Sequence, residues 1–188
     1  MSHVVLGLLF AVGPQSIYSL NKFFEAGISL FYAASLGALR QTLLRLLDEG
    51  RVTGSGSRDG GRAKKVYTIT DTGREQFLAW MRAPISDRKL EVVALSKLYF
   101  LGALGRREDR RIALRSIVDR ARADEAQLLA IAPAVAAAEV PEQYRDLARY
   151  QRLTLDYGLQ SHALGRDFFE RLLTEEEEEE EEEDGQRR

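Results

Sequence analysis

Two groups of polar side chains have the types and spacing needed to contact a nucleic acid. In the first, Gln41 and Arg45 lie four residues apart in an amphipathic segment, so they share one face of a helix. Glutamine can read an adenine edge, and arginine can read guanine or hold a phosphate. Gly37 and Ala38 would let the first turn of this helix approach closely. The segment predicts a DNA-contacting helix, with a merely solvated face as the alternative.

The second group is a cluster of bases on a turn rich in Gly and Ser. Its bases are Arg58, Arg62, Lys64 and Lys65, against the single acid Asp59. Cations on such a turn favour contact with phosphates, which adds affinity but carries no direct sequence information. A turn that only aids solubility is the alternative interpretation.

The sequence lacks the arrangement of side chains that a transition-metal site or an acid/base catalyst needs. The chain has no cysteine, and its only histidines, His3 and His162, stand far apart in the sequence. No transition-metal site can be built from this set, and no pair of carboxylates stands out as an acid/base couple. We therefore expect no catalytic residues, no metal and no cofactor, and we do not expect an enzyme.

The net charge of the 188-residue chain, −2, hides two populations of charge. Residues 175–184 are ten consecutive acids. Without them and the final Arg187 and Arg188, residues 1–174 hold 25 bases and 19 acids, a net charge of +6. We expect the acidic run to be a disordered tail, because like charges repel and nothing in it can be buried. It could instead compete with phosphates for the basic turn, or bind a basic partner.

The order of the predicted elements indicates how these groups are positioned. Helices are expected over 3–12, 16–26 and 36–49, with Ser35 as the N-cap and Gly50 just past the C-terminus of the third. A hairpin of 51–53 and 66–70 and a helix from about 71 follow. Three helices, a hairpin and a helix predict a winged helix-turn-helix, in which one helix enters the major groove.

Helices are also expected over 90–102, 106–132 and 142–173. The fold class is mainly α (α+β), with a winged helix-turn-helix over 1–83, a helical dimerisation domain over 84–174 and the tail over 175–188. The last helix has two apolar faces, more than one small domain needs, so one of them is expected to pack against a partner chain. The dimerisation residues that we expect on that face are Tyr150, Leu153, Tyr157, Leu164, Phe168 and Leu172.

Several motifs in order resemble the PadR family of transcriptional regulators. Residues 13–20 (GPQSIYSL) are similar to its G-P-x-x-G-Y-x-L, and 60–70 (GGRAKKVYTIT) to its G-R-x-x-K-x-Y-x-x-T. Residues 35–39 (SLGAL) and 95–101 (LSKLYFL) extend the likeness, which covers 4–173. The chain departs from the family at Ile17, where glycine is usual, and at Arg40-Gln41, where tyrosine-proline is usual. That tyrosine often touches DNA in the family, so these departures bear on the base contacts.

The resemblance implies a homodimeric repressor that is relieved by a small effector. A two-fold dimer should bind double-stranded DNA at an inverted repeat, and a cytoplasmic protein is the default expectation. Trp80, Tyr99 and Phe100 are most simply core residues, and a pocket lined by aromatics at a dimer interface could take a flat hydrophobic effector. No segment is long and apolar enough to span a membrane. A protein-interaction scaffold, or an effector sensor with altered DNA contacts, remains the alternative. The expected DNA contacts are Ser16, Tyr18, Lys22, Ser35, Ala38, Arg40, Gln41, Arg45, Arg62, Lys64 and Lys65.

Overall fold

The computed structural model describes residues 1–26, 28–30, 32, 35–59, 62–86 and 90–186. The side chains at 30, 57–59, 62–64 and 179–186 lie outside this description. Backbone contacts divide the chain into two compact units, Met1–Ala113 and Leu114–Arg188. The domain boundary expected near Pro84 stays a prediction.

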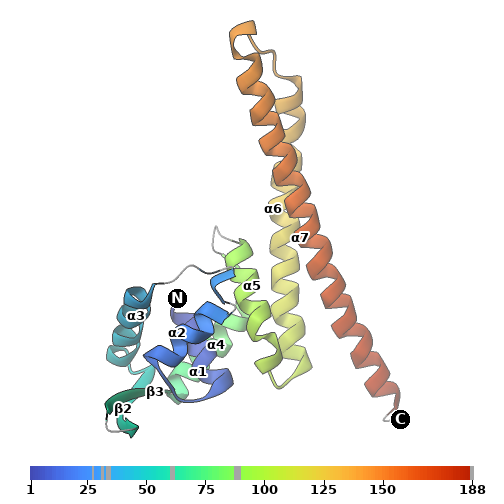
Figure 1. Cartoon of the computed structure of the whole chain (residues 1–188). Coiled ribbons are helices and arrows are strands. Elements are labelled where there is room, and N and C mark those ends of the chain that lie inside the picture. Colours follow the sequence, from blue (N-terminus) through green and yellow to red (C-terminus); the bar gives the residue numbers. More distant parts are fainter. Residues whose placement is uncertain (27, 31, 33–34, 60–61, 87–89, 187–188) are drawn as a thin grey trace. The chain divides into compact units, whose positions relative to one another are not determined.

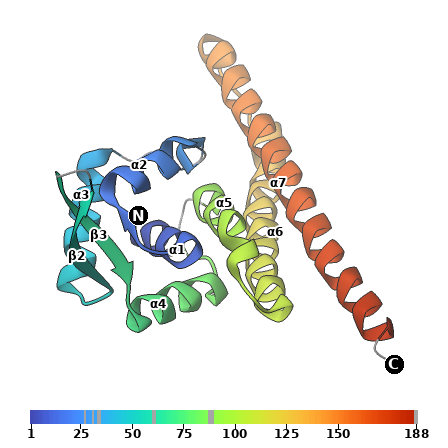
Figure 2. The ribbon, with the colours of Figure 1, turned by 60° about the horizontal axis from the view of Figure 1, so that its bottom comes forward.

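The first unit is built around α1 (Ser2–Val12), a helix that is apolar on nearly every side and buried from Val4 to Leu9. Its neighbours in the fold include α3 (Leu36–Asp48), α4 (Asp71–Arg82) and α5 (Leu90–Phe100). Figure 2 shows α1 in the middle of these elements. Gly7 lets the Phe100 ring approach, since a Cβ there would lie 2.8 Å from the ring. Because α1 is buried so deeply, it fixes the positions of the helices that pack on it.

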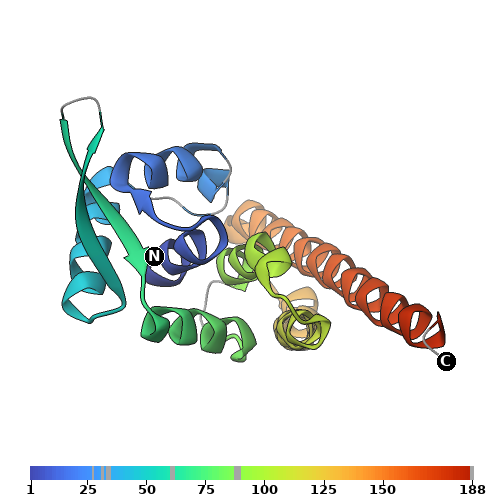
Figure 3. The same ribbon diagram turned by 90° about the horizontal axis from the view of Figure 1, so that it is seen from below.

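A small antiparallel sheet lies beside these helices (Figure 3). Its strands are β1 (Gln15–Ser16), β2 (Val52–Asp59) and β3 (Arg62–Ile69), in the order β1-β3-β2. The β2–β3 register runs from Val52 opposite Ile69 to Asp59 opposite Arg62. The hairpin is thus longer than the sequence predicts, because its Gly- and Ser-rich arm pairs instead of forming a loop.

The remaining elements of this unit are α2 (Ile17–Ala26), the short helices η1 (Ile28–Leu30) and η2 (Leu101–Ala103), and the start of α6 (Arg107–Ala137). Arg82, the last residue of α4, binds Asp109 of α6 through two hydrogen bonds of 2.7 and 2.9 Å. Three helices, a hairpin and a fourth helix follow one another as the sequence predicts. The fold class, mainly α with a winged helix-turn-helix, is confirmed.

The second unit consists of the rest of α6, η3 (Glu142–Tyr144) and the 42-residue α7 (Arg145–Gln186). The two long helices run side by side in opposite directions (Figure 1). Ion pairs join them: Arg122 Nε lies 2.6 Å from Glu170 Oε1, and Arg166 pairs with Glu125. α6 also continues through Pro133 to Ala137, past the end predicted at 132. Because proline has no N–H, position 133 makes no hydrogen bond to the carbonyl of Leu129.

The acidic run is helical in this structure, since α7 extends to Gln186. The sequence leads us to expect disorder there. Glutamate is itself a good helix former, and adding residues to an existing helix needs no new nucleus. Arg115 also compensates part of the negative charge, with its guanidinium 2.5 Å from Glu177 Oε1.

Candidate DNA interface and ligand pocket

The N-terminal end of α3 combines a capped first turn with an exposed surface of small side chains. The Ser35 hydroxyl accepts a hydrogen bond of 3.1 Å from the amide of Ala38, as expected of an N-cap. Leu39, Leu43 and Leu46 are fully buried and hold the helix on the core. The opposite face exposes Ala38, Arg40, Gln41 and Arg45 together, as the sequence predicts.

Arg45 already has partners within the protein. Its guanidinium donates a hydrogen bond of 2.6 Å to the hydroxyl of Ser2, at the start of α1. Its Nε lies 3.8 Å from a carboxylate oxygen of Glu49, one helical turn further along. Arg45 is therefore an exposed cation that is held toward α1. Sequence reasoning missed this contact, because Ser2 is 43 residues away.

Thr70 joins the end of α3 to the hairpin and to α4. Its hydroxyl lies 2.9 Å from the carbonyl of Gly50 and 3.0 Å from that of Arg51, and it accepts a hydrogen bond from the amide of Gly73. A Cβ at Gly73 would lie 2.2 Å from the Arg51 carbonyl oxygen, so only glycine fits this approach. The α3 helix, the hairpin and α4 are thus tied together at one residue.

Three of the four basic hairpin residues lie on β3, and Arg58 lies on β2. Lys65 is exposed opposite Gly56, and its ammonium lies 5.5 Å from the centre of the Tyr67 ring. Arg62 and Lys64 occupy β3 positions opposite Asp59 and Ser57. Their side chains, like that of Arg58, lie outside the described residues. Lys65 is therefore the basic hairpin side chain whose surroundings the structure gives.

The expected contacts near α2 divide into exposed and buried residues. Tyr18 is 69% exposed, and Lys22 is exposed on the same helix. Ser16, by contrast, is only 3% exposed. Its hydroxyl accepts a hydrogen bond from the amide of Ser19, so it caps the start of α2 and does not present a free surface group. The placement of Ser16 corrects the sequence-based expectation.

The two apolar faces expected on the last helix differ in burial. The face opposite the predicted dimerisation residues includes Phe169, which is 7% exposed. On the predicted face, Tyr157 and Leu164 are the most open, at 74% and 73% exposed. Leu172 is half-buried, and the other exposed members of this face are Tyr150, Leu153 and Phe168. A role of this face in dimerisation stays a prediction.

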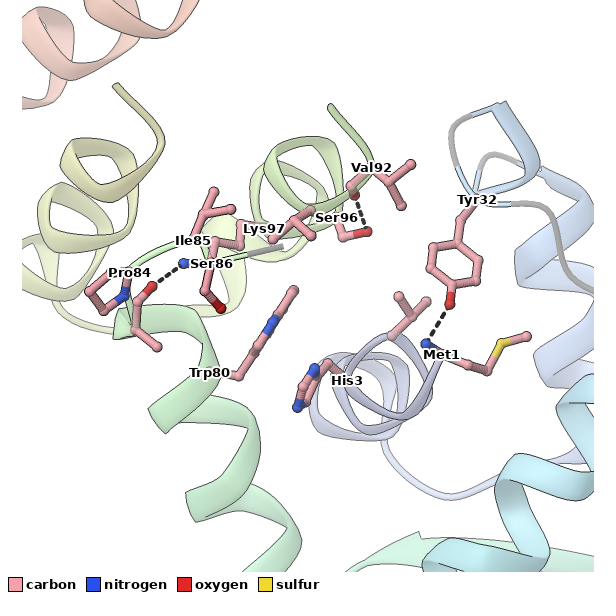
Figure 4. Close-up of a pocket in the computed structure, with 13 residues that line it drawn as sticks. Met1, His3, Tyr32, Trp80, Pro84, Ile85, Ser86, Val92, Ser96 and Lys97 are labelled. Atoms are coloured by element: carbon pink, nitrogen blue, oxygen red, sulfur yellow. Dashed lines mark hydrogen bonds between the residues drawn. The ribbon is translucent and has the colours of Figure 1, made fainter. Parts of the chain in front are cut away.

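A cavity of about 630 Å³ lies in the first unit, between α1, α4 and α5. Figure 4 shows the rings of His3 and Trp80 next to each other at its wall, and their centres are 4.8 Å apart. Of the three aromatic residues expected in the core, Trp80 lines the cavity. Phe100 is buried in the core as expected, whereas Tyr99 is 45% exposed, which corrects its expected place there.

The cavity also contains a buried cation. The Lys97 ammonium donates a hydrogen bond of 2.6 Å to the carbonyl of Ala83 and lies 5.9 Å from the centre of the Trp80 ring. Burial lowers the pKa of Lys97 to about 8. Burial also lowers the pKa of His3 to about 4, so the imidazole is neutral at neutral pH. The cavity thus presents the Lys97 ammonium, the terminal ammonium of Met1 and aromatic rings, which suits a flat anionic ligand better than a purely hydrophobic one.

Two further properties bear on the chemistry of the chain. Across the described ranges, no three His, Asp or Glu side chains are grouped so as to hold a metal ion. No helix in the described part of the chain has the length and apolar character needed to cross a membrane.

Comparison with known proteins gives a family match to the first unit. Residues 5–79 match the family model described as "Transcriptional regulator PadR-like family". The negative transcriptional regulator PadR of Bacillus subtilis (strain 168) is 31% identical over 111 residues. That match covers 57% of this chain and 60% of the relative.

Solved structures are similar over more of the chain but with low scores. Bacillus subtilis PadR in complex with operator DNA has a TM-score of 0.42 and 22% identity, over 93% of this chain and 98% of that one. The same regulator in complex with p-coumaric acid has a TM-score of 0.39 and 23% identity, over 94% of each chain. Residues 5–79 thus match the model of the PadR-like family of transcriptional regulators, the family that the sequence motifs resemble.

Proposed function

We propose that this chain is a DNA-binding transcriptional repressor that acts in the cytoplasm as a homodimer and is relieved by a small effector. The observation that carries the proposal is the exposed, capped N-terminal half of α3 beside a basic hairpin, within a region that matches the PadR-like family model. The relative from Bacillus subtilis is a negative regulator, and its solved complex holds operator DNA. The proposal gives the chain no catalytic activity.

The division of labour between α3 and the hairpin follows from their chemistry. A helix fits the major groove, and its N-terminal residues meet the base edges. Strand β3 carries Arg62, Lys64 and Lys65, three cations in four residues, which suit the phosphate backbone. A two-fold dimer would present two copies of α3 to an inverted-repeat site, so the exposed face of α7 is part of the same proposal.

The effector part of the proposal rests on the cavity beside Trp80 and Lys97. A relative is known in complex with p-coumaric acid, a flat aromatic acid. A ligand of that class would stack on Trp80 and place its carboxylate near Lys97. Because Lys97 also holds the carbonyl that follows α4, such a ligand would compete for a contact at the end of the DNA-binding domain.

Binding of the full chain to DNA selected from a random pool tests the central claim. We expect a two-fold symmetric site and an affinity that falls as salt rises. Replacing Arg62, Lys64 and Lys65 by glutamine should weaken binding to all sequences and flatten the salt dependence. Replacing the exposed bases Arg145, Arg149 and Arg152 of α7 by glutamine provides a control that removes the same three charges.

Two outcomes would contradict the proposal. Failure to select any DNA, with salt-independent weak binding, would favour a protein-interaction scaffold. A cavity ligand found by thermal shift, together with no DNA binding at any salt concentration, would favour an effector sensor with altered DNA contacts.

A further inference from the structure

We propose that α3 reads an A·T base pair through Gln41, with Leu44 against a thymine methyl group, and that Arg45 is a positioning residue that reads no base. This inference rests on the proposed DNA-binding function and names the sequence element that the same surface recognises. It follows from what surrounds each exposed side chain of α3.

Gln41 lies at the middle of the exposed face of α3. The residues three before and three after it on this face, Ala38 and Leu44, expose only apolar side-chain atoms. Leu44 is 47% exposed. This face therefore presents the Gln41 amide between the methyl group of Ala38 and the isobutyl group of Leu44. No role for Leu44 is predicted from the sequence.

This face exposes two cations, Arg40 and Arg45, and Arg45 is held at its edge. Arg45 donates to the Ser2 hydroxyl at 2.6 Å and approaches the Glu49 carboxylate to 3.8 Å, so reading guanine would require it to leave both groups. Asp48 is the last residue of α3 and Glu49 follows it. Both are exposed acids that would repel phosphates. The N-terminal half of α3 is thus the part suited to enter a groove.

The chemistry of these groups matches one kind of base pair. Only a side chain with both a donor and an acceptor, such as the Gln41 amide, pairs with both N6 and N7 of adenine. The C5-methyl of thymine is the apolar group in the major groove, and Leu44 offers an apolar surface to it. Ala38 is small enough to let this turn come close. An A·T pair uses all three residues, whereas a G·C pair leaves Leu44 without an apolar partner.

Base analogues in the selected site test this contact atom by atom. For the full chain, 7-deazaadenine at the critical adenine should weaken binding roughly tenfold, since it removes one of two hydrogen bonds. Deoxyuridine in place of the thymine removes a single methyl group and should weaken binding about fourfold. In Gln41→Ala, 7-deazaadenine should no longer weaken binding. In Leu44→Ala, deoxyuridine should no longer weaken binding. Gln127→Ala, an exposed glutamine of α6, should keep both.

Arg45 is tested by repeating the site selection. Arg45→Ala and Ser2→Ala should select the same sequence as the unchanged protein, with weaker binding overall, because both lose the anchor of α3 on α1. Loss of preference at one G·C position in Arg45→Ala alone would overturn the positioning role. Salt-dependent binding that shows neither analogue penalty would overturn the A·T assignment while leaving the proposed function standing. Absence of salt-dependent DNA binding would overturn both.

Discussion

The guanidinium of Arg82, at the end of α4, binds both carboxylate oxygens of Asp109, near the start of α6. The Asp109 side chain is only 10% exposed, whereas that of Arg82 remains 43% exposed. This bidentate pair connects the last helix of the winged domain to the helix that leads out of the first unit. The hydrogen bond from Arg82 also lowers the pKa of Asp109.

Replacing Asp109 by asparagine should therefore destabilise the protein in a pH-dependent way. A carboxyl group with a lowered pKa in the folded state stabilises that state above its unfolded pKa, and loses this effect as pH falls through the folded pKa. At pH 7 we expect a cost of about 1 kcal/mol, discounted because Arg82 is partly solvated. Urea unfolding at pH 7 and pH 3 measures it, with Asp119→Asn as control. An equal cost at both pH values would contradict this origin.

The neutral His3 should make the fold sensitive to mild acid. Its pKa is lowered to about 4 from an unfolded value near 6.5, so the unfolded chain takes up the proton first. The free energy of unfolding should then be highest above pH 6.5 and should fall by about 1 to 2 kcal/mol as the pH drops toward 4, after allowance for solvent screening. Melting temperatures at pH 7 and pH 5 should differ less in His3→Phe, which keeps a ring against Trp80. His162→Phe should leave the difference unchanged.

Gly73→Ala should be strongly destabilising. The added Cβ would lie 2.2 Å from the Arg51 carbonyl oxygen, a backbone atom that cannot move without disturbing the hairpin. We expect a loss of at least about 2 kcal/mol in the free energy of unfolding. In Gly37→Ala the nearest atom is the Ser35 hydroxyl at 3.8 Å, so that helical glycine should give a neutral change or a gain of up to about 1 kcal/mol. Similar losses in both variants would contradict the steric argument.

The exposed face of α7 should determine the oligomeric state. Tyr157→Glu and Leu164→Glu place charges where we expect a second copy, and should convert a dimer to a monomer with unchanged helical content. Light scattering after size exclusion measures the mass, and circular dichroism the helicity. Gln151→Glu adds the same charge at an exposed position of α7 that is not three or four residues from any member of this face, and it should preserve the dimer. A monomeric unchanged protein would refute this part of the proposal.

Deleting residues 175–188 should leave the domain folded and tighten non-specific DNA binding at low salt. The deletion removes ten acids and two bases, a net change of eight charges toward positive. It also removes the Arg115–Glu177 and Arg171–Glu175 pairs, which are exposed and contribute little to stability. Titration of a random-sequence duplex at low and high salt checks this. Equal affinities at low salt would mean that the acidic run takes no part in binding.

The sequence predicts the winged domain well where local patterns decide the structure. Ser35 caps α3 as expected, and Gly50 follows the helix with a φ of 66°. Both positions are determined by backbone geometry within a few residues. The leucine stripe of α3 likewise predicts which of its faces is buried.

Other features depend on partners that are distant in the sequence. The two-residue β1 is too short to show an alternating pattern, and it forms because β3 lies alongside. The direction of the Arg45 side chain depends on Ser2, to which it donates a hydrogen bond. The burial of Ser16 depends on β3, with which its strand pairs. The cavity is formed by α1, α4 and α5 together, so no single segment reveals its lining.

The hydroxyl of Thr70 has a further consequence for how the DNA would be searched. Because one residue joins the end of α3, the hairpin and the start of α4, we expect these elements to move as a single body. Such a body has little backbone freedom to lose on docking, so the entropic cost of binding is small at every site, matched or mismatched. Discrimination between sites must then come from the side chains and from the shape of the DNA, and not from folding of the reading surface.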